Sequence, residues 1–323
     1  MFTLDELEEA ARIVGAALAP TPQIAWPLLA RRTGCEVWVK HENHTPIGAF
    51  KMRGGLVWLD AVLRAGHVPA GLISATRGNH GQSLAFAGSR AGIPVTICVP
   101  EGNAVEKNAA MRALGAELIE TGRDFDEARE AAERLAEERG LVMVPSFHRD
   151  LVRGVATYAL ELFRAVAGLD TVYVSIGMGS GICGLIRTRD LLGLETRIVG
   201  VVSERAPAYA RSVASGRVVT TETARTFADG MACRVPSPEA LAVIRKGAER
   251  IVEVGEDEVA GAIRAYFTDT HNLAEGAGAA PLAALLAERE AMRGRRVGVI
   301  LSGGNIDMDV CRTVLAGGTP QAA

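Results

Sequence analysis

The stretch HENHTPIGAFKMRGG, residues 41–55, is the part of the sequence on which the fold and the chemistry depend. It places a lone lysine, Lys51, directly after Phe50 and shortly before two glycines, where a helix is expected to begin. At a helix start, the helix dipole and partial burial disfavour the charged form of a lysine and lower its pKa. Such an amine can act as a Schiff-base nucleophile, whereas most lysines are solvated surface groups. Lys51 is therefore a candidate catalytic residue that other motifs must support.

The two histidines of this stretch come close to a zinc signature without matching it. H-E-x-x-H binds zinc because residues four apart share one face of a helix. His41 and His44 are three apart at the end of a β-branched run, where we expect them to point to opposite faces of a strand. We therefore expect no metal site here and interpret the segment as a strand edge that leads into a loop.

Composition points to a small-molecule partner. The 323 residues, 48% of them hydrophobic, suffice for one large or two medium domains. A net charge of −3 and scattered basic residues offer no one-sided positive field for nucleic acid or an anionic membrane. The acidic start, with Thr3 and Glu6 in capping-box spacing, is unlike a signal peptide, and no apolar run reaches the roughly 18 residues of a membrane span. Five widely spaced cysteines favour a reducing cytoplasm.

Short β-rich apolar runs alternate along the chain with Ala- and Leu-rich stretches at helical period, such as residues 124–139 and 150–167. The runs are residues 36–42, 71–76, 94–100, 116–122, 141–146, 171–177, 197–203 and 295–303. This alternation predicts an α/β fold whose parallel sheet is covered by helices on both faces. Ligands of such folds bind where strands end and helices begin, because helix N-termini and glycine-rich turns offer free N–H donors. Four junctions carry polar motifs: TPIGAFKMRGG, ATRGNHGQS, GMGSGICG and SGGNID.

The junction GMGSGICG, residues 177–184, supports two interpretations. Gly179, Gly181 and Gly184 match G-x-G-x-x-G after an expected strand. Glu204 stands where a ribose-binding acid would lie, so a nicotinamide-dependent oxidoreductase is one candidate. The same glycines suit any phosphate monoester, because backbone N–H groups without Cβ obstruction can close around an anion. The loop predicts a phosphate and leaves its identity open.

A Schiff-base lysine, a phosphate loop, a polar loop and a C-terminal Ser-Gly-Gly-Asn together are the parts of a pyridoxal phosphate site. On these motifs the chain resembles the fold type II pyridoxal phosphate enzymes, the tryptophan synthase β-subunit superfamily, and within it the serine/threonine dehydratase group. P-x-G-A-F-K-x-R-G, GNHGQ, GMGSG and LSGGN follow in order, so the resemblance covers nearly the whole chain. It implies an α/β fold of two open twisted sheets of mostly parallel strands flanked by helices, with the cofactor in the cleft between domains. Residues 1–50 and 148–323 would form a large cofactor-binding domain and residues 51–147 a small mobile one.

The resemblance also implies roles for individual residues. Lys51 would carry the cofactor with Phe50 beside it, Asn79 would bond the ring hydroxyl, and Ser302 would face the pyridine nitrogen. The phosphate would lie on Gly177, Met178, Gly179, Ser180 and Gly181. The substrate would be held by Thr76, Arg77, Gly78, Asn79 and His80, which bind its carboxylate, and by Thr45 and Glu275 nearby.

Ser302 bears on the type of reaction. A hydroxyl does not stabilise a protonated pyridine as a carboxylate does, so long-lived carbanions are disfavoured and fast β-elimination is favoured. We expect a β-hydroxy amino acid to displace Lys51, whose freed amine removes the Cα proton while the β-hydroxyl leaves. The products would be a 2-oxo acid and ammonia, which makes the protein a dehydratase, or ammonia-lyase. The alternative within the same fold is a β-replacement enzyme similar to cysteine synthase.

Departures from the family pattern narrow these expectations. Racemising members carry a serine where this chain has Arg77, whose guanidinium could pair with the substrate carboxylate or with a second one, as in 3-hydroxyaspartate. The family's cation ligands are replaced around Glu204, so no metal is expected there. Phe227 and Met231, together with HENHTP, are expected to widen the pocket, which adds phenylserine to threonine and serine as a substrate. We also expect a homo-oligomer.

Overall fold

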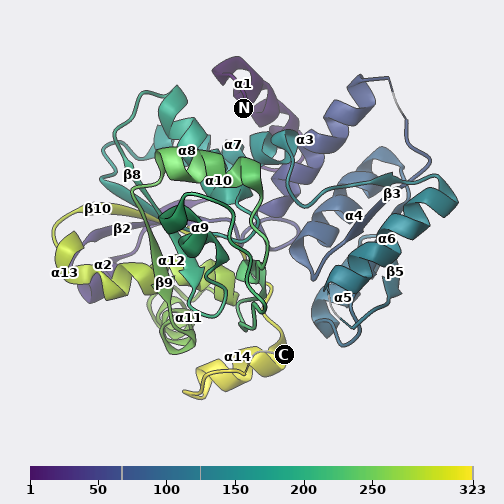
Figure 1. The fold of residues 1–323 in the computed structure, drawn as a ribbon. Coiled ribbons are helices and arrows are strands. Elements are labelled where there is room, and N and C mark those ends of the chain that lie inside the picture. Colours follow the sequence, from purple (N-terminus) through teal and green to yellow (C-terminus); the bar gives the residue numbers. More distant parts are fainter. Residues whose placement is uncertain (67, 124, 322–323) are drawn as a thin grey trace.

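The computed structural model describes residues 1–66, 68–123 and 125–321, which build two sheets that share no strand (Figure 1). The larger sheet has the order β1-β2-β10-β7-β8-β9. Its strands are β1 (Gln23–Ala25), β2 (Glu36–His41), β7 (Thr171–Ser175), β8 (Arg197–Ser203), β9 (Arg250–Val254) and β10 (Arg296–Leu301). The short edge strand β1 pairs antiparallel with β2, and the other pairs in this sheet are parallel. The last strand along the chain, β10, therefore lies in the middle, between β2 and β7.

The smaller sheet has the order β5-β4-β3-β6 and is parallel throughout. Its strands are β3 (Leu72–Ala75), β4 (Val95–Val99), β5 (Glu117–Glu120) and β6 (Val142–Met143). Helices α4 (Asn79–Ala91), α5 (Val105–Ala113) and α6 (Phe125–Arg139) surround it, and Figure 1 shows this group on the right. We call this group the small unit and the six-stranded sheet with its helices the large unit.

The large unit contains most of the helices. Their bounds are α1 (Leu4–Gly15), α2 (Pro27–Thr33), α7 (Arg149–Ala165), α8 (Ser180–Leu191), α9 (Ala208–Ser215), the 3₁₀ helix η1 (Asp229–Met231), α10 (Pro238–Gly247), α11 (Glu256–Thr270), α12 (Gly276–Ala287), α13 (Arg289–Met292) and α14 (Met308–Leu315). Helix α3 (Lys51–Arg64) packs against both α4 and α7, so it lies between the units. No helix in the described ranges is long and apolar enough to cross a membrane.

Both faces of the large sheet are buried. Neighbouring residues of β7 belong to different cores: Tyr173 packs in the cluster that includes α11 and α12, whereas Val172 and Val174 pack in the cluster that includes α7 and α8. Since side chains alternate along a strand, this division means that helices cover both sides. The small sheet is covered in the same way, by α4 and α5 on one face and α6 on the other.

The α/β architecture with two mostly parallel sheets confirms the fold expected from the sequence. The capping box of Thr3 and Glu6 is also present at the start of α1. The edge strands β1 and β9 were not predicted, because one is very short and the other carries Arg250 and Glu253. The predicted helix 124–139 is α6, although residue 124 itself lies outside the described residues. The mobility of residues 51–147 stays a prediction.

Candidate active site

A cleft opens between the two units where the four sequence motifs meet. This placement follows from the topology, because the loops after parallel strands gather at the carboxyl end of each sheet. The lining residues are Phe50, Lys51, Ala75, Thr76, Arg77, Gly78, Asn79, His80, Lys107, Phe125, Ser146, Ser175, Gly177, Met178, Gly179, Ser180, Gly181, Asp229, Gly230, Ala232, Cys233, Glu275, Ala277 and Ser302. The residues predicted to bind the cofactor or the substrate are all among them except Thr45, whereas Phe227 and Met231, which were expected to widen the pocket, are not.

Backbone contacts join the lysine motif to the Ser-Gly-Gly motif. Ala49 and Gly303 form an isolated antiparallel bridge, and the N–H of Phe50 donates to the carbonyl of Ser302 at 3.0 Å. Helix α3 then begins at Lys51, as the sequence predicted. Two motifs from opposite ends of the chain are thereby held on the same wall of the cleft.

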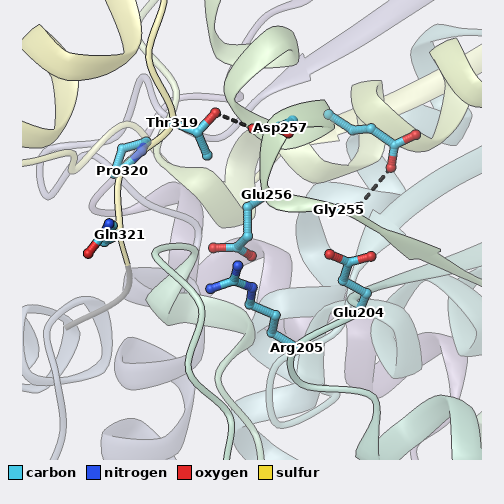
Figure 2. A pocket seen from close by; sticks show the side chains of 9 residues that line it. Glu204, Arg205, Gly255, Glu256, Asp257, Thr319, Pro320 and Gln321 are labelled. Atoms are coloured by element: carbon cyan, nitrogen blue, oxygen red, sulfur yellow. Dashed lines mark hydrogen bonds between the residues drawn. The ribbon is translucent and has the colours of Figure 1, made fainter.

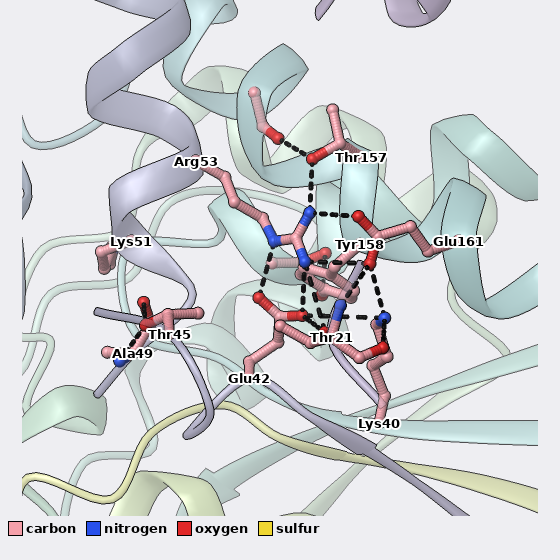
Figure 3. A network of polar contacts seen from close by, with 12 residues as sticks. Thr21, Lys40, Glu42, Thr45, Ala49, Lys51, Arg53, Thr157, Tyr158 and Glu161 are labelled. Carbon is pink, nitrogen blue, oxygen red and sulfur yellow. Dashed lines mark hydrogen bonds and ion pairs between the residues drawn. The ribbon is translucent and has the colours of Figure 1, made fainter. Parts of the chain in front are cut away.

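A buried network of charges holds the first turn of α3 (Figure 3). The Arg53 guanidinium, which is fully buried, donates to Glu42 at 2.7 and 2.9 Å and to Glu161 at 2.6 and 2.9 Å. Lys40 donates to Glu161 at 2.6 Å. Two positive and two negative charges thus neutralise one another away from water. Because Arg53 follows Lys51 by two residues, this network fixes the helix turn that carries the candidate nucleophile.

Lys51 has the surroundings of a reactive amine. Burial lowers the pKa of its side chain to about 8, against the opposing effect of the Glu275 carboxylate. Its Nζ lies 5.1 Å from the centre of the Phe50 ring and donates to Ser180 Oγ at 3.4 Å. An amine with this pKa is partly neutral near physiological pH, and only the neutral form is nucleophilic.

The loop after β7 is shaped to receive an anion. Gly179 adopts φ 96°, a left-handed conformation that favours glycine, and α8 begins at the next residue, Ser180. The Tyr209 hydroxyl donates to the carbonyl of Met178 at 3.0 Å, and the Tyr158 hydroxyl to that of Gly181 at 3.1 Å. These bonds fix the shape of the loop. The first N–H groups of a helix have no partner within the helix, so those at the start of α8 suit a phosphate.

The loop after β3, residues 76–80, forms the facing wall. The N–H of Gly78 donates to the Thr76 hydroxyl at 3.1 Å, which sets the turn into α4. Burial, together with the charge of Lys51, lowers the pKa of His80 to about 3, so this imidazole is neutral. Its Nε2 is buried and has no hydrogen-bond partner among the described residues. Arg77 is exposed at the rim of the cleft.

A polar cluster inside the cleft was not anticipated from the sequence. Lys107 donates to Asp229 at 2.6 Å and to Glu275 at 3.3 Å. Glu275 also accepts from the Asn79 amide at 2.6 Å, and Asn305 donates to the Asn79 oxygen at 2.8 Å. No short sequence motif contains Lys107 or Asp229. Their importance becomes visible only from the contact that they make with each other across the cleft. Asn305 closes the LSGGN motif, but its partner could not be read from that motif.

Several residues singled out in the sequence lie elsewhere. The Thr45 hydroxyl accepts from the N–H and donates to the carbonyl of Ala49, both at 2.9 Å, so it shapes the loop before Lys51 (Figure 3). Met231, the last residue of η1, is buried in the core of the large unit, and Phe227 packs against the same core. Neither lines the cleft, so the widened aromatic pocket expected from them is not formed.

The expected placement of His41 and His44 on opposite strand faces is wrong. Strand β2 ends at His41, and the turn that follows brings His44 back so that the two rings stack at 5.0 Å. His41 Nε2 accepts from the Trp26 indole at 2.9 Å, and burial, with a smaller contribution from His44, lowers its pKa to about 4. His41 is therefore a neutral aromatic ring that packs behind the loop.

Glu204 lies at a separate hollow that shares no residue with the cleft (Figure 2). Its neighbours there are Arg205, residues 255–258 and residues 319–321. A ribose-binding acid would have to face the same space as the glycine loop. The geometry thus gives no support to a dinucleotide site built on Glu204.

The cleft fits pyridoxal phosphate on several independent grounds. The left-handed Gly179 and the start of α8 form a cradle for the phosphate. The buried Lys51 amine faces this cradle, and the unpartnered His80 nitrogen shows that the space suits a polar group. Lys51 would hold the carbonyl carbon, and Ser302, which is 5% exposed, would face the ring nitrogen.

Comparisons with known proteins agree with this geometry. The model of the family described as pyridoxal-phosphate dependent enzyme matches residues 14–303. An L-threonine ammonia-lyase of Geobacter sulfurreducens is 37% identical over 290 residues, covering 90% of this chain and 72% of that protein. An L-threo-3-hydroxyaspartate ammonia-lyase of a Pseudomonas species is 31% identical over 314 residues, covering 97% and 98%. The crystal structure of a threonine deaminase from T.th. is 31% identical, with a TM-score of 0.89 over 95% of this chain and 99% of that one.

The family model spans most of the chain, and the cofactor's predicted contacts meet in one cleft. This protein therefore belongs to the pyridoxal-phosphate dependent enzyme family, in the serine/threonine dehydratase group of fold type II, and its cofactor is pyridoxal phosphate.

Proposed function

We propose that the protein is a dehydratase, or ammonia-lyase, that converts a β-hydroxy amino acid to a 2-oxo acid and ammonia. The observation that carries this proposal is a cleft lined both by a buried Lys51, whose pKa is lowered to about 8, and by a serine, Ser302, which would face the ring nitrogen. A weak partner for that nitrogen disfavours long-lived carbanions, so loss of a β-leaving group is the favoured outcome. The similarity to proteins named threonine and hydroxyaspartate ammonia-lyases supports it.

The residues of the cleft divide the work between binding and proton transfer. When bound, pyridoxal phosphate supplies an electron sink for the charge that develops at Cα of the substrate. In the loop of residues 76–80 the N–H groups of Thr76 and Gly78 already donate within the protein, so those of Arg77, Asn79 and His80 hold the substrate carboxylate. The Lys51 amine takes the Cα proton as the β-hydroxyl leaves. Elimination removes one water, and hydrolysis of the resulting enamine takes up one water and releases ammonia.

We propose further that the substrate carries a second carboxylate or a small hydroxyalkyl side chain. Of the cations that line the cleft, Lys107 is paired with two carboxylates and Lys51 faces the phosphate cradle. Arg77 remains as an exposed guanidinium at the rim, suited to a carboxylate through a bidentate charge-assisted bond. Arg77 therefore favours 3-hydroxyaspartate. Because Phe227 and Met231 do not line the cleft, threonine and serine also rank above phenylserine.

Release of ammonia and 2-oxo acid from these four amino acids, measured without an added nucleophile, tests the proposal. Activity should require the bound cofactor, which is detected by its visible absorption. Lys51→Ala should lose both the absorption and the activity. Product formation only in the presence of a thiol or another added nucleophile would instead establish the β-replacement alternative. A colourless protein that binds nicotinamide nucleotides would overturn the assignment altogether.

A cytoplasmic location, a small-molecule amino acid substrate and a homo-oligomeric state complete the proposal. All five cysteines are free and buried, which supports a reducing compartment. The oligomeric state is measurable by light scattering during size-exclusion chromatography.

A further inference from the structure

A lysine of the small unit reaches across the cleft into the large unit. Lys107 lies on α5, and its side chain is 7% exposed. Its ammonium contacts Asp229 of η1 at 2.6 Å and Glu275, the N-cap residue of α12, at 3.3 Å. Charges of both units therefore meet at one buried point inside the cleft.

The same carboxylate that binds Lys107 also orients Asn79. Glu275 Oε2 accepts from Lys107, and Oε1 accepts from the Asn79 amide at 2.6 Å. Asn305 donates to the Asn79 oxygen at 2.8 Å. An ionised carboxylate accepts hydrogen bonds and does not donate them, so it fixes which end of the amide faces it. One N–H of Asn79 is left over for the ring oxygen of the cofactor.

Two carboxylates share one ammonium in this cluster, so the cluster has an excess of negative charge. Burial raises the pKa of Glu275, Lys107 opposes the rise, and Asp229 adds to it. Burial alone would lower the pKa of Lys107, but Asp229 and Glu275 outweigh it and raise that pKa. The Glu275 carboxylate also interacts with the charge of Lys51 on α3. Lys107 is thus the contact that most opposes protonation of Glu275, and the hydrogen bond from Asn79 acts in the same direction.

We propose that Lys107 is a positioning residue, which couples contact between the two units to the orientation of the cofactor through Glu275 and Asn79. If Glu275 gains a proton, it can donate, and it then competes with Asn305 for the Asn79 oxygen. Lys107 also supports the loop that faces the substrate, since a Cβ on Gly78 would lie 2.5 Å from its Cδ. One side chain therefore braces the carboxylate loop and sets the proton affinity of Glu275.

The sequence offers a matched control. The chain has only four lysines among its 35 basic residues, and they are Lys40, Lys51, Lys107 and Lys246. Lys246 is exposed near the end of α10, outside the cleft. Lys246→Met therefore makes the same chemical change as Lys107→Met, the loss of one ammonium group, at a solvated place on the surface.

The experiment measures the visible spectrum of the bound cofactor against pH for both variants. Lys107→Met should move the pH midpoint of the spectrum upward and lower kcat by about 10- to 100-fold, as expected when a cofactor is misplaced. Asp229→Asn removes the opposing charge and should move the midpoint downward. Lys246→Met should match the unmodified protein. Equal spectra and pH profiles for Lys107→Met and Lys246→Met would overturn the proposal.

A second measurement uses the apoprotein and does not depend on the reaction. Without Lys107, ionised Glu275 is buried with less compensation, so Lys107→Met should lose more thermal stability at pH 8 than at pH 5. In a Glu275→Gln background the further loss of Tm should be smaller and equal at the two pH values, because only the contact with Asp229 and the packing against Gly78 remain to be lost. Additive losses in the double variant would overturn the coupling and leave Lys107 a purely structural role. Only the kcat measurement rests on the proposed function. If the protein does not catalyse β-elimination, the spectra and the Tm values still test the role of Lys107.

Discussion

Glu42→Gln is the substitution that tests the buried charge network behind Lys51. Glu42 is fully buried and accepts two bonds from Arg53 and one, at 2.5 Å, from the Thr21 hydroxyl. Glutamine has nearly the same shape, but its amide replaces one acceptor by a donor that faces other donors. Glu161 then remains as the carboxylate partner of Arg53 and is shared with Lys40, so the network carries one uncompensated positive charge.

The expected cost follows from burial and from the size of the chain. Removal of one partner of a buried ion pair costs about 3–5 kcal/mol, and because Glu161 still pairs with Arg53, we expect about 3 kcal/mol. With an unfolding entropy of about 2.1 cal/mol/K per residue, a chain of this length loses roughly 1.5 °C of Tm per kcal/mol. Glu42→Gln should therefore lower Tm by about 4 °C in calorimetry.

A surface pair provides the control for this measurement. Arg129 and Glu133 lie 3.2 Å apart on α6 with side chains 47% and 51% exposed. Exposed pairs contribute about 0.5 kcal/mol or less, so Glu133→Gln should change Tm by less than about 1 °C. The double variant Glu42→Gln/Arg53→Met should be more stable than Arg53→Met alone, because no unpaired Glu42 carboxylate remains. Equal effects of Glu42→Gln and Glu133→Gln would refute the reasoning.

Four further outcomes are expected. Arg77→Ala should raise KM for 3-hydroxyaspartate by about 10-fold or more, because a hydrogen bond to a charged group is lost, and should change KM for threonine much less. Equal changes in the two KM values would show that Arg77 does not recognise the substrate side chain. Gly179→Ala should weaken cofactor binding to the apoprotein about 10-fold, because φ 96° is strained for alanine and its Cβ would lie 2.8 Å from that of Ala240; an unchanged Kd would contradict this. Burial lowers the pKa of Lys51 to about 8, so the rate at which the apoprotein takes up pyridoxal phosphate should rise with pH and level off above about 8, whereas a rise continuing toward pH 10 would indicate an ordinary lysine. Burial, and then the Glu106 carboxyl, raise the pKa of Asp307 from 3.8 to about 6. The folded state therefore binds this proton more tightly than the unfolded state, and the stability of the fold decreases as the pH rises from about 4 to 6. Asp307→Asn should raise Tm at pH 7.5 and leave it unchanged at pH 4.

Local patterns were enough to predict the fold class and the motifs of the cofactor site. Alternating β-rich and helical stretches indicated the parallel sheets. The four strand-to-helix junctions contain nearly all of the predicted site residues that line the cleft. These features are readable because parallel strands bring their loops to a common edge whatever the remaining sequence.

The parts that escaped prediction depend on contacts between distant segments. Glu42 was interpreted only as part of a strand edge that leads into a loop, yet it shares Arg53 with Glu161, which lies 108 positions from that arginine. The stacking of His41 and His44 depends on where β2 stops, which the strand period does not reveal. Lys107 carries no motif at all.

The central position of β10 has a consequence for synthesis of the chain. Strands β2 and β7 have no common neighbour until β10, which follows both of them along the chain, is inserted between them. The small unit is encoded by one continuous segment and can form earlier, because its sheet uses strands from β3 to β6 in succession. Ser302, directly after β10, joins Phe50 only then. The site is complete only after residues up to Ser302 have left the ribosome, so we expect cofactor loading to follow the folding of both units and to report it.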